Sequence, residues 1–253
     1  MMNYIKSEFY RITHTRDFYG YTALLIALSV LANLAICLVG ETYATTSFSF
    51  SNLVANPMTF GFMGALTAGL LYEGSRKNGN LKNTVAFGVT RRKIFLGQCL
   101  VSLLAAGTAM IFTLAAWISS AILLLENKGP VKLSHLLWEV PAVILIAAAC
   151  MVSQILFMEF FDKTYVSIVL WLAIWFLIPK VLFYLSFSID FLIPIALWFP
   201  ENLFSTYLSH INTQECITAW DTSQGMIRCL IMGGAGTLLF TLSGLVLLKK
   251  KDL

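Results

Sequence analysis

Charged side chains are scarce in this sequence: they make up 12% of the 253 residues, whereas soluble domains carry about 25%. Hydrophobic residues make up 58%, and the mean hydropathy is +0.78. Because this surplus of apolar side chains exceeds what a soluble core buries, we expect lipid to surround much of the chain. No Ser/Gly-rich or acidic stretch separates two segments, so residues 1–253 are predicted to form a single membrane domain.

The sequence also lacks the motifs of several enzyme and cofactor classes. The five cysteines are scattered without a CxxC pair, and His14, His135 and His210 lie far apart, so no metal site is predicted. We interpret the cysteines as packing residues, with a Cys216–Cys229 disulfide as the less favoured alternative. No G-x-x-x-x-G-K-[ST] loop is present to hold phosphates, and no Ser/His/Asp grouping indicates catalysis. We therefore predict no catalytic residue and no directly bound cofactor.

Six apolar stretches are long enough to cross a bilayer, which takes ~20 residues at ~1.5 Å each. They cover residues 21–39, 53–72, 99–125, 140–158, 164–188 and 229–248. The fifth is interrupted by Pro179 and Lys180, and we expect Pro179 to kink it. A shorter apolar stretch, 191–199, cannot span, so the segment 189–228 is predicted to carry an interfacial or re-entrant element on the outer side. The fold class is thus all-α integral membrane with six transmembrane helices.

The basic residues predict the orientation. Most of the 17 Lys and Arg fall near the N-terminus, in the loop 73–97 and near the C-terminus. Since cytoplasmic loops of membrane proteins carry the excess of Lys and Arg, both termini and this loop are expected in the cytoplasm. The predicted location is the cell membrane, with the chain crossing it several times.

Residues 1–18 are predicted to form an interfacial helix. Tyr4, Ile5, Phe9 and Ile12 recur near i, i+4 and i+7 spacing with basic residues between them, which favours an amphipathic helix on the inner membrane surface. A partly ordered charged tail is the alternative. The charges run through the whole segment and do not indicate a cleaved signal peptide.

The loop 73–97 carries the most informative pattern. A short helix is favoured by Leu81, Thr84, Val85 and Ala86. Gly88 suits a left-handed C-terminal cap, and Thr90 suits the N-cap of the following helix. A short helix held between two membrane helices is a rigid contact element. The alternative is an electropositive turn that merely obeys the distribution of basic residues.

The same loop resembles a family pattern. The matching residues are Glu73, Gly-Asn-Leu-Lys-Asn at 79–83, Phe-Gly-Val at 87–89 and Arg-Arg-Lys-Ile-Phe-Leu-Gly at 91–97. This run resembles the segment between the second and third helices of ABC-2-type permeases, the membrane subunits of a class of ATP-binding-cassette transporters. Residues 4–11 (Tyr-Ile-Lys-Ser-Glu-Phe-Tyr-Arg) are similar to the interfacial helix that opens those permeases. The six-helix layout also matches.

The resemblance implies that the loop helix is a coupling helix that sits in a groove of a cytoplasmic ATPase. Leu81, Val85 and Phe87 would be its apolar anchors, with Lys82 on the same element. Arg91 and Arg92 would pair with acidic partner residues or, equally, with lipid phosphate. The implied partners are an ATPase dimer that binds ATP and Mg²⁺, a second identical or related permease, and membrane lipid; no nucleic acid is implied.

Polar and aromatic residues of the fifth span are candidates for a substrate path. Lys180 is expected to reach the outer interface by its long side chain, with contact to an acidic part of the substrate as the alternative. Trp171 and Trp175 share a face with Ile178 and Leu182. We expect that face to contact lipid or a second subunit, and a substrate cage is the less favoured alternative.

Other polar and small residues are given structural interpretations. Glu159 and Asp162, beside Lys163 at the end of the fourth span, are interpreted as solvated loop charges, although the pair also suits acid–base chemistry. Asn33 is expected to make an interhelical hydrogen bond. A stripe of small residues in the second span predicts close helix packing: Gly61, Ala65, Ala68 and Gly69.

The functional expectation follows from the resemblance: a permease subunit of a bacterial exporter, moving hydrophobic or amphipathic cargo such as a peptide, toxin, antibiotic or lipid. The alternative is a stand-alone membrane protein, either a secondary transporter or an intramembrane enzyme or assembly factor. Secondary transporters usually contain internal repeats and ionisable residues near the membrane midplane. In the sequence only Lys180 approaches that position.

Overall fold

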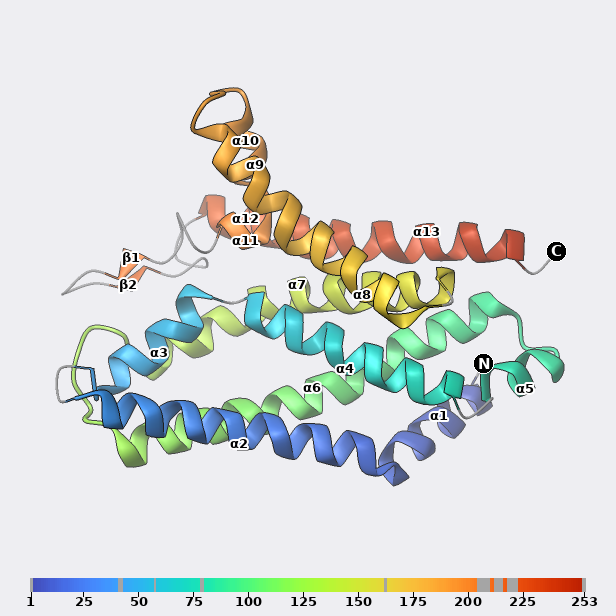
Figure 1. Cartoon of the computed structure of the whole chain (residues 1–253), viewed down its shortest axis with the longest axis horizontal. Helices are drawn as coiled ribbons and strands as arrows, with labels where there is room; N and C mark the ends of the chain where they lie inside the picture. The colour runs from blue at the N-terminus through green and yellow to red at the C-terminus, as the bar shows by residue number, and fades with distance from the viewer. Residues whose placement is uncertain are drawn as a thin grey trace.

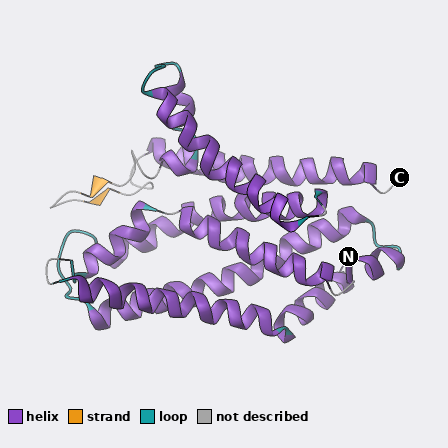
Figure 2. Ribbon diagram, viewed as in Figure 1, coloured by secondary structure: helices purple, strands orange, loops and turns teal. Residues whose placement is uncertain are grey.

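The chain forms a bundle of long helices (Figures 1 and 2). The computed structural model describes residues 2–40, 43–56, 58–77, 80–161, 163–203, 210–211, 216–217 and 223–251. In chain order the elements are α1 (Met2–His14), α2 (Arg16–Val39), α3 (Thr46–Ala55), α4 (Met58–Lys77), α5 (Asn80–Ala86), α6 (Arg91–Leu124), α7 (Leu133–Phe160), α8 (Thr164–Leu172), η1 (Ala173–Leu177), α9 (Ile178–Ser186), α10 (Leu192–Ala196), α11 (Pro200–Leu203), β1 (His210–Ile211), β2 (Cys216–Ile217), α12 (Ser223–Leu230), η4 (Ile231–Ala235) and α13 (Gly236–Lys251).

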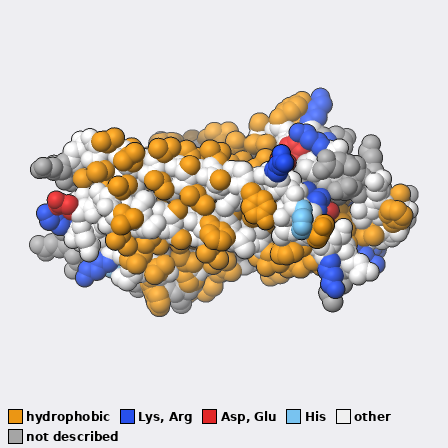
Figure 3. Space-filling model, turned by 90° about the horizontal axis from the view of Figure 1, so that it is seen from below, with side chains coloured by type: hydrophobic (Ala, Val, Ile, Leu, Met, Phe, Trp, Pro, Cys, Tyr) orange, Lys and Arg blue, Asp and Glu red, His pale blue; other side chains and the backbone are white. Residues whose placement is uncertain are grey.

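The bundle has the helix lengths and the surface of a multi-pass membrane protein. Five helical stretches of the described chain are long and apolar enough to span: Arg16–Val39, Arg91–Leu124, Leu133–Phe160, Thr164–Ser186 and Ile227–Lys249. On the face seen in Figure 3, hydrophobic side chains cover the middle, and charged ones gather toward the two ends. The predicted helical membrane class is thus confirmed. The count of six spans stays a prediction, because it depends on a bent pair of helices.

That bent pair is α3 and α4, and the apolar stretch predicted as one span at 53–72 is divided between the two helices. The helix direction bends by 65° between them. Thr45 caps α3, its hydroxyl accepting a hydrogen bond from the N–H of Phe48 at 3.2 Å. At the other end Asn56 leaves the helical region, with φ −130° and ψ 58°. Pro57 follows in the sequence, and a residue before proline is disfavoured from helical geometry.

Helix α7 forms the centre of the bundle. It packs along α4, α13, α6 and α8, and 78% of its most apolar stretch is buried. Small residues permit the close contact with α4: a Cβ built on Gly61 would lie 3.1 Å from Sγ of Cys150. The predicted packing role of the small-residue stripe is confirmed at this position.

Both termini and α5 lie at one end of the bundle, on the right in Figure 1. This arrangement is what a topology with both termini on the same side requires. The predicted interfacial helix ends at His14, earlier than expected, and α2 begins at Arg16 after an extended Thr15. On α1, Ile12 is buried, whereas Phe9 is about half exposed.

The last two spans each contain one turn of π-helix, η1 and η4. Pro179 is the second residue of α9, two positions after η1 ends at Leu177; it has no N–H to donate, so the turn before it lacks a regular hydrogen bond and is widened. Beyond this point α9 and α10 project away from the bundle (Figure 1, top). The apolar element predicted at 191–199 is α10, with α11 following it; its re-entrant character stays a prediction.

Candidate functional site

The loop between α4 and α6 is built around α5, a helix of seven residues. It ends in a glycine motif: the N–H of Gly88 donates to the carbonyl of Val85 at 2.9 Å, and that of Val89 donates to the carbonyl of Thr84 at 3.2 Å. Gly88 has φ +82°, the left-handed conformation that this motif requires. The predicted helix and its glycine cap are confirmed. The chain leaves α5 through a tight, defined turn.

The apolar side chains of this loop are exposed. Phe87 is 87% exposed and Val85 is 40% exposed. Leu81 and Lys82 belong to α5 by their backbone; their side chains lie outside the described ones. Two of the predicted apolar anchors are therefore available to a partner.

The start of α6 carries the predicted basic residues. Arg91 and Arg92 are half-buried, and Nε of Arg92 is enclosed by protein. Thr90 does precede the helix, but its hydroxyl makes no capping hydrogen bond; its backbone carbonyl accepts from the N–H of Ile94 at 3.1 Å instead. Thr90 was thus predicted correctly as the residue before the helix, but the predicted capping by its side chain is wrong.

A buried polar cluster, centred on the carboxylate of Glu8, lies beside this loop. Oε2 of Glu8 accepts from Arg11 Nη2 at 2.9 Å, Ser75 Oγ at 2.9 Å and Gln98 Nε2 at 3.1 Å. Gln98 Nε2 also lies 2.8 Å from the hydroxyl of Tyr4. Sequence analysis missed this cluster, because Glu8 looks like an exposed residue of an amphipathic helix; the signal was its i, i+4 relation to Tyr4 and Ile12.

The Glu8 cluster ties α1 to both helices that flank α5. Ser75 is in the last turns of α4, and Gln98 is in the first turns of α6. Burial, followed by the charge of Glu8, raises the pKa of Tyr4, so its hydroxyl keeps its proton. A Cβ on Gly97 would lie 2.7 Å from the Tyr4 ring, so α1 and α6 are in direct contact.

The interpretation of Glu159 as a solvated charge is wrong. Its side chain is 8% exposed and hydrogen-bonded to Tyr72 of α4. The ends of α4 and α7 approach each other there, with Arg76 Nη1 lying 3.4 Å from the carbonyl of Phe161. The packing of α4 against α7 keeps the Glu159 side chain away from water. Asp162 lies outside the described residues.

The expected lipid or subunit contact of Trp171 and Trp175 is also wrong. They are 2% and 6% exposed. Their indole N–H groups donate to α7, that of Trp171 to the carbonyl of Cys150 at 2.9 Å and that of Trp175 to the hydroxyl of Ser153 at 3.0 Å. Both rings therefore anchor the fifth span to the central helix.

Lys180 has a partner within the chain. Its Nζ lies 3.1 Å from Oε1 of Glu201 on α11, with the side chains 40% and 18% exposed. The carboxylamide of Asn202 donates to the carbonyl of Pro179 at 2.8 Å, which holds α11 against α9. The ion pair and this hydrogen bond together hold the segment that follows the fifth span against α9.

Cys229 is a buried free thiol, so the alternative of a Cys216–Cys229 disulfide is wrong.

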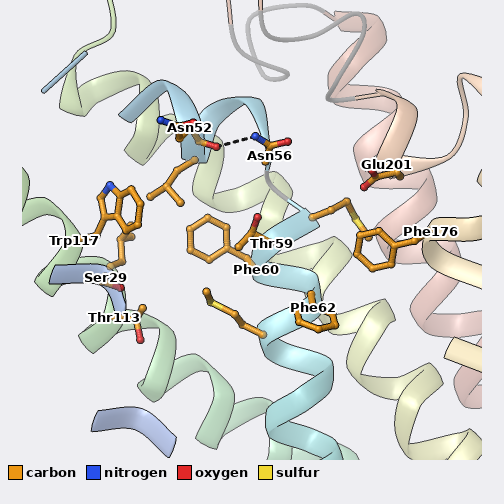
Figure 4. A pocket seen from close by; sticks show the side chains of 14 residues that line it. Ser29, Asn52, Asn56, Thr59, Phe60, Phe62, Thr113, Trp117, Phe176 and Glu201 are labelled. Carbon is orange, nitrogen blue, oxygen red and sulfur yellow. Dashed lines mark hydrogen bonds between the residues drawn. The ribbon is translucent and has the colours of Figure 1, made fainter. Parts of the chain in front are cut away.

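A cavity of about 410 Å³ lies between α2, the α3–α4 bend, α6 and η1 (Figure 4). Its aromatic wall comes from Phe60, Phe62, Trp117 and Phe176. Its polar lining comes from Ser29, Asn52, Asn56, Thr59, Thr113 and Glu201. The predicted path residue Lys180 does not line this cavity, but its ion-pair partner Glu201 does. Phe176, next to Trp175, also lines it. The bend between α3 and α4 opens the space, since Asn56 and Thr59 stand on its two sides.

The chain was compared with models of protein families, with curated proteins and with solved structures, and nothing matched in any of the three comparisons. The described residues also contain no group of three or more His, Cys, Asp or Glu side chains arranged to hold a metal ion. Two features of the described residues are candidates for function: the exposed α5 loop at one end of the bundle and the cavity toward the other.

Proposed function

We propose that this chain is the membrane subunit of a bacterial ATP-driven exporter of the ABC-2 type, which assembles with a cytoplasmic ATPase dimer and a second permease. One observation carries the proposal: α5 is a short capped helix, followed by the 87% exposed Phe87, at the bundle end where both termini lie. A compact element with an exposed aromatic anchor suits a pocket on a partner protein.

The contacts around α5 suggest how a push on it would spread. The helices α4 and α6 adjoin it in the chain, and the Glu8 cluster joins α1 to both. A displacement of α5 would therefore move three packed helices together, as rigid elements. Since α4 and α6 also line the cavity, through residues such as Phe62 and Trp117, such a movement would change its shape.

The supply of energy and the type of cargo follow from the same features. The sequence has no phosphate-binding loop, so ATP and Mg²⁺ would bind to the partner ATPase. The cavity combines aromatic rings with amides and hydroxyls, which suits a hydrophobic or amphipathic cargo such as a peptide, toxin, antibiotic or lipid.

Co-purification tests the proposal. The tagged chain is expressed together with its neighbouring genes and isolated in mild detergent. We expect an ATPase to co-purify, and Val85→Asp and Phe87→Asp to lose it, because a charge would replace the apolar anchor. Tyr43→Asp is the matched control, an exposed aromatic residue between α2 and α3. If no ATPase accompanies the wild-type chain, or if Phe87→Asp retains it fully, the proposal is wrong.

One finding favours the alternative of a secondary transporter. Two carboxyl groups of the central helix α7, those of Glu139 and Glu159, are buried, with exposures of 3% and 8%. Buried carboxyl groups are the usual carriers of coupling protons in such proteins. Uptake of a cargo into vesicles that hold only this chain, driven by a proton gradient and without ATP, would support this alternative over the exporter.

A further inference from the structure

Hydrogen-bond acceptors dominate the polar lining of the cavity. The hydroxyl of Ser29 donates to the carbonyl of Leu25 at 2.9 Å, and that of Thr113 donates to the carbonyl of Ala109 at 2.8 Å. A hydroxyl has one proton. Both groups therefore present only lone pairs to anything in the cavity.

The two asparagines each keep one N–H donor beside a carbonyl acceptor. Nδ2 of Asn52 donates to the carbonyl of Phe48 at 2.8 Å, and Nδ2 of Asn56 donates to the carbonyl of Asn52 at 3.2 Å, the contact drawn in Figure 4. Each amide spends one of its two N–H groups on the helix that carries it. The indole nitrogen of Trp117 is itself buried by protein. A ligand in the cavity would thus meet more acceptors than donors.

The charge of the lining has one sign. Glu201 is the one charged residue among the described residues that line the cavity. Its ion-pair partner, Lys180, is not part of the lining and is the more exposed of the two, 40% against 18%. The carboxylate therefore faces the cavity, and the ammonium group lies toward the outside.

The aromatic wall also suits a positive charge. Phe60, Phe62 and Phe176 stand around the same space as Glu201 (Figure 4). The faces of aromatic rings attract cations. A phosphate or carboxylate group would find neither a cationic side chain nor a surplus of donors among the lining residues.

We infer that this cavity binds a hydrophobic organic cation, with its ammonium group on Glu201 and its apolar part against the aromatic wall. As the cargo site of an exporter the cavity depends on the proposed function, but as a binding site it does not. Binding exchanges one cation for another at the Glu201 carboxylate: the ligand's ammonium replaces Nζ of Lys180. The two members of the ion pair therefore have opposite effects on affinity.

The test uses the whole chain, purified in lipid nanodiscs without any ATPase. Two probes are matched: a dansylated alkylamine with a free primary ammonium group, and a dansylated carboxylic acid of the same length. We expect the ammonium probe to bind and the carboxylate probe to bind at least ten-fold more weakly. Equal binding of the two, or a preference for the carboxylate, would overturn the inference, whatever the outcome of the co-purification experiment.

Variants locate the site. Glu201→Gln should weaken binding of the ammonium probe at least ten-fold, and Lys180→Gln should tighten it several-fold, because the ammonium group that competes with the probe is removed. Glu126→Gln, an exposed acid outside the cavity, is the control and should change nothing. Full affinity in Glu201→Gln, or weaker binding in Lys180→Gln, contradicts the exchange. Should the ion-pair variants fail to fold, Phe176→Leu decides: it should weaken the ammonium probe several-fold, and unchanged affinity contradicts the site.

Discussion

Individual glycines set how closely the helices of this protein approach one another. Gly233, in the π-helical turn η4, faces the backbone of α7: a Cβ there would lie 2.6 Å from Cβ and 2.8 Å from the carbonyl carbon of Leu145. Main-chain atoms cannot rotate out of the way as a flexible side chain can. At Gly234, the next residue, a Cβ would meet nothing within 4 Å. Of these two neighbouring glycines, Gly234 has space for a Cβ and Gly233 does not.

We expect Gly233→Ala to destabilise the protein by about 1–3 kcal/mol, because α13 and η4 must move away from α7. Thermal unfolding of the purified protein in detergent measures the change. Gly234→Ala is the matched control and should unfold at or slightly above the wild-type temperature, since alanine favours helix. Equal stability of the two variants would show that η4 does not touch α7 as described.

The carboxylate of Glu8 is a second critical residue. Glu8→Gln would replace the carboxylate that Arg11, Ser75 and Gln98 share with a neutral amide. The hydrogen bonds then lose the assistance of the negative charge and Arg11 loses its ion-pair partner, at a cost of about 1–3 kcal/mol. We expect a lower unfolding temperature and faster proteolysis after α1. Glu73→Gln, which breaks an exposed pair with Lys77, should cost less than about 1 kcal/mol. Similar losses in both variants would argue against a structural role for the buried cluster.

Glu8 and Asn33 illustrate which contacts could not be predicted from the sequence. Hydropathy identified the membrane helices, and spacing identified the helix in the loop 73–97, because both signals are local. The burial of Glu8 depends on Ser75 and Gln98, which are far away in the chain, so its role is invisible in the pattern of α1. The interhelical role of Asn33 was predictable in kind, since a polar group inside a span needs a partner; its partners, Trp117, Ser120 and Ser49, were not.

At the scale of elements, the α5 loop depends on one backbone conformation. Gly88 has φ +82°, and a Cβ there would meet nothing within 4 Å. Any cost of substitution is therefore conformational, about 1–2 kcal/mol for a residue forced into the left-handed region. That cost falls on the turn and not on the packing of the bundle.

We expect Gly88→Val to loosen the turn after α5 while the unfolding temperature of the protein changes little. Limited trypsin digestion is the measurement: cleavage at Arg91, Arg92 and Lys93 should become several-fold faster. Gly107→Ala, at an open position within α6, is the control and should leave the digestion rate unchanged. Unaltered cleavage in Gly88→Val would mean that the glycine cap does not hold the loop.

Two features at this scale were not predicted from the sequence: the break between α3 and α4, and the burial of the two tryptophans against α7. The Asn56–Pro57 pair was a local signal for a helix end, but the apolar content of residues 53–72 concealed it. The tryptophan spacing correctly indicated one shared face. It could not indicate that this face meets Cys150 and Ser153, because the neighbour of a membrane helix is set by the whole bundle and not by its own sequence.

At the scale of the whole molecule, both termini and α5 lie together at one end, and the loop between α2 and α3 lies at the other (Figure 1). The distribution of Lys and Arg predicts that the α5 end lies in the cytoplasm. The geometry and the charge pattern are independent observations that agree on a common side for the termini and α5.

Labelling of single cysteines tests this orientation. In a variant without native cysteines, Tyr43→Cys should react with a membrane-impermeant maleimide added to intact cells. Phe87→Cys should react only after the cells are opened. Both residues are exposed, so access through the membrane and not burial decides the outcome. Labelling of Phe87→Cys from outside would invert the topology and remove the basis for a cytoplasmic partner at α5.

The widened turn η1 lets one span serve two surfaces. Trp175 faces the central helix while the next residue, Phe176, lines the cavity. Any rotation of this span that reshapes the cavity must strain the indole hydrogen bonds to Cys150 and Ser153. The two indoles therefore respond to a change in the cavity. In a Trp117→Phe variant, which lacks the indole in the cavity wall, a shift of tryptophan emission on ligand binding would report such a change without an added label.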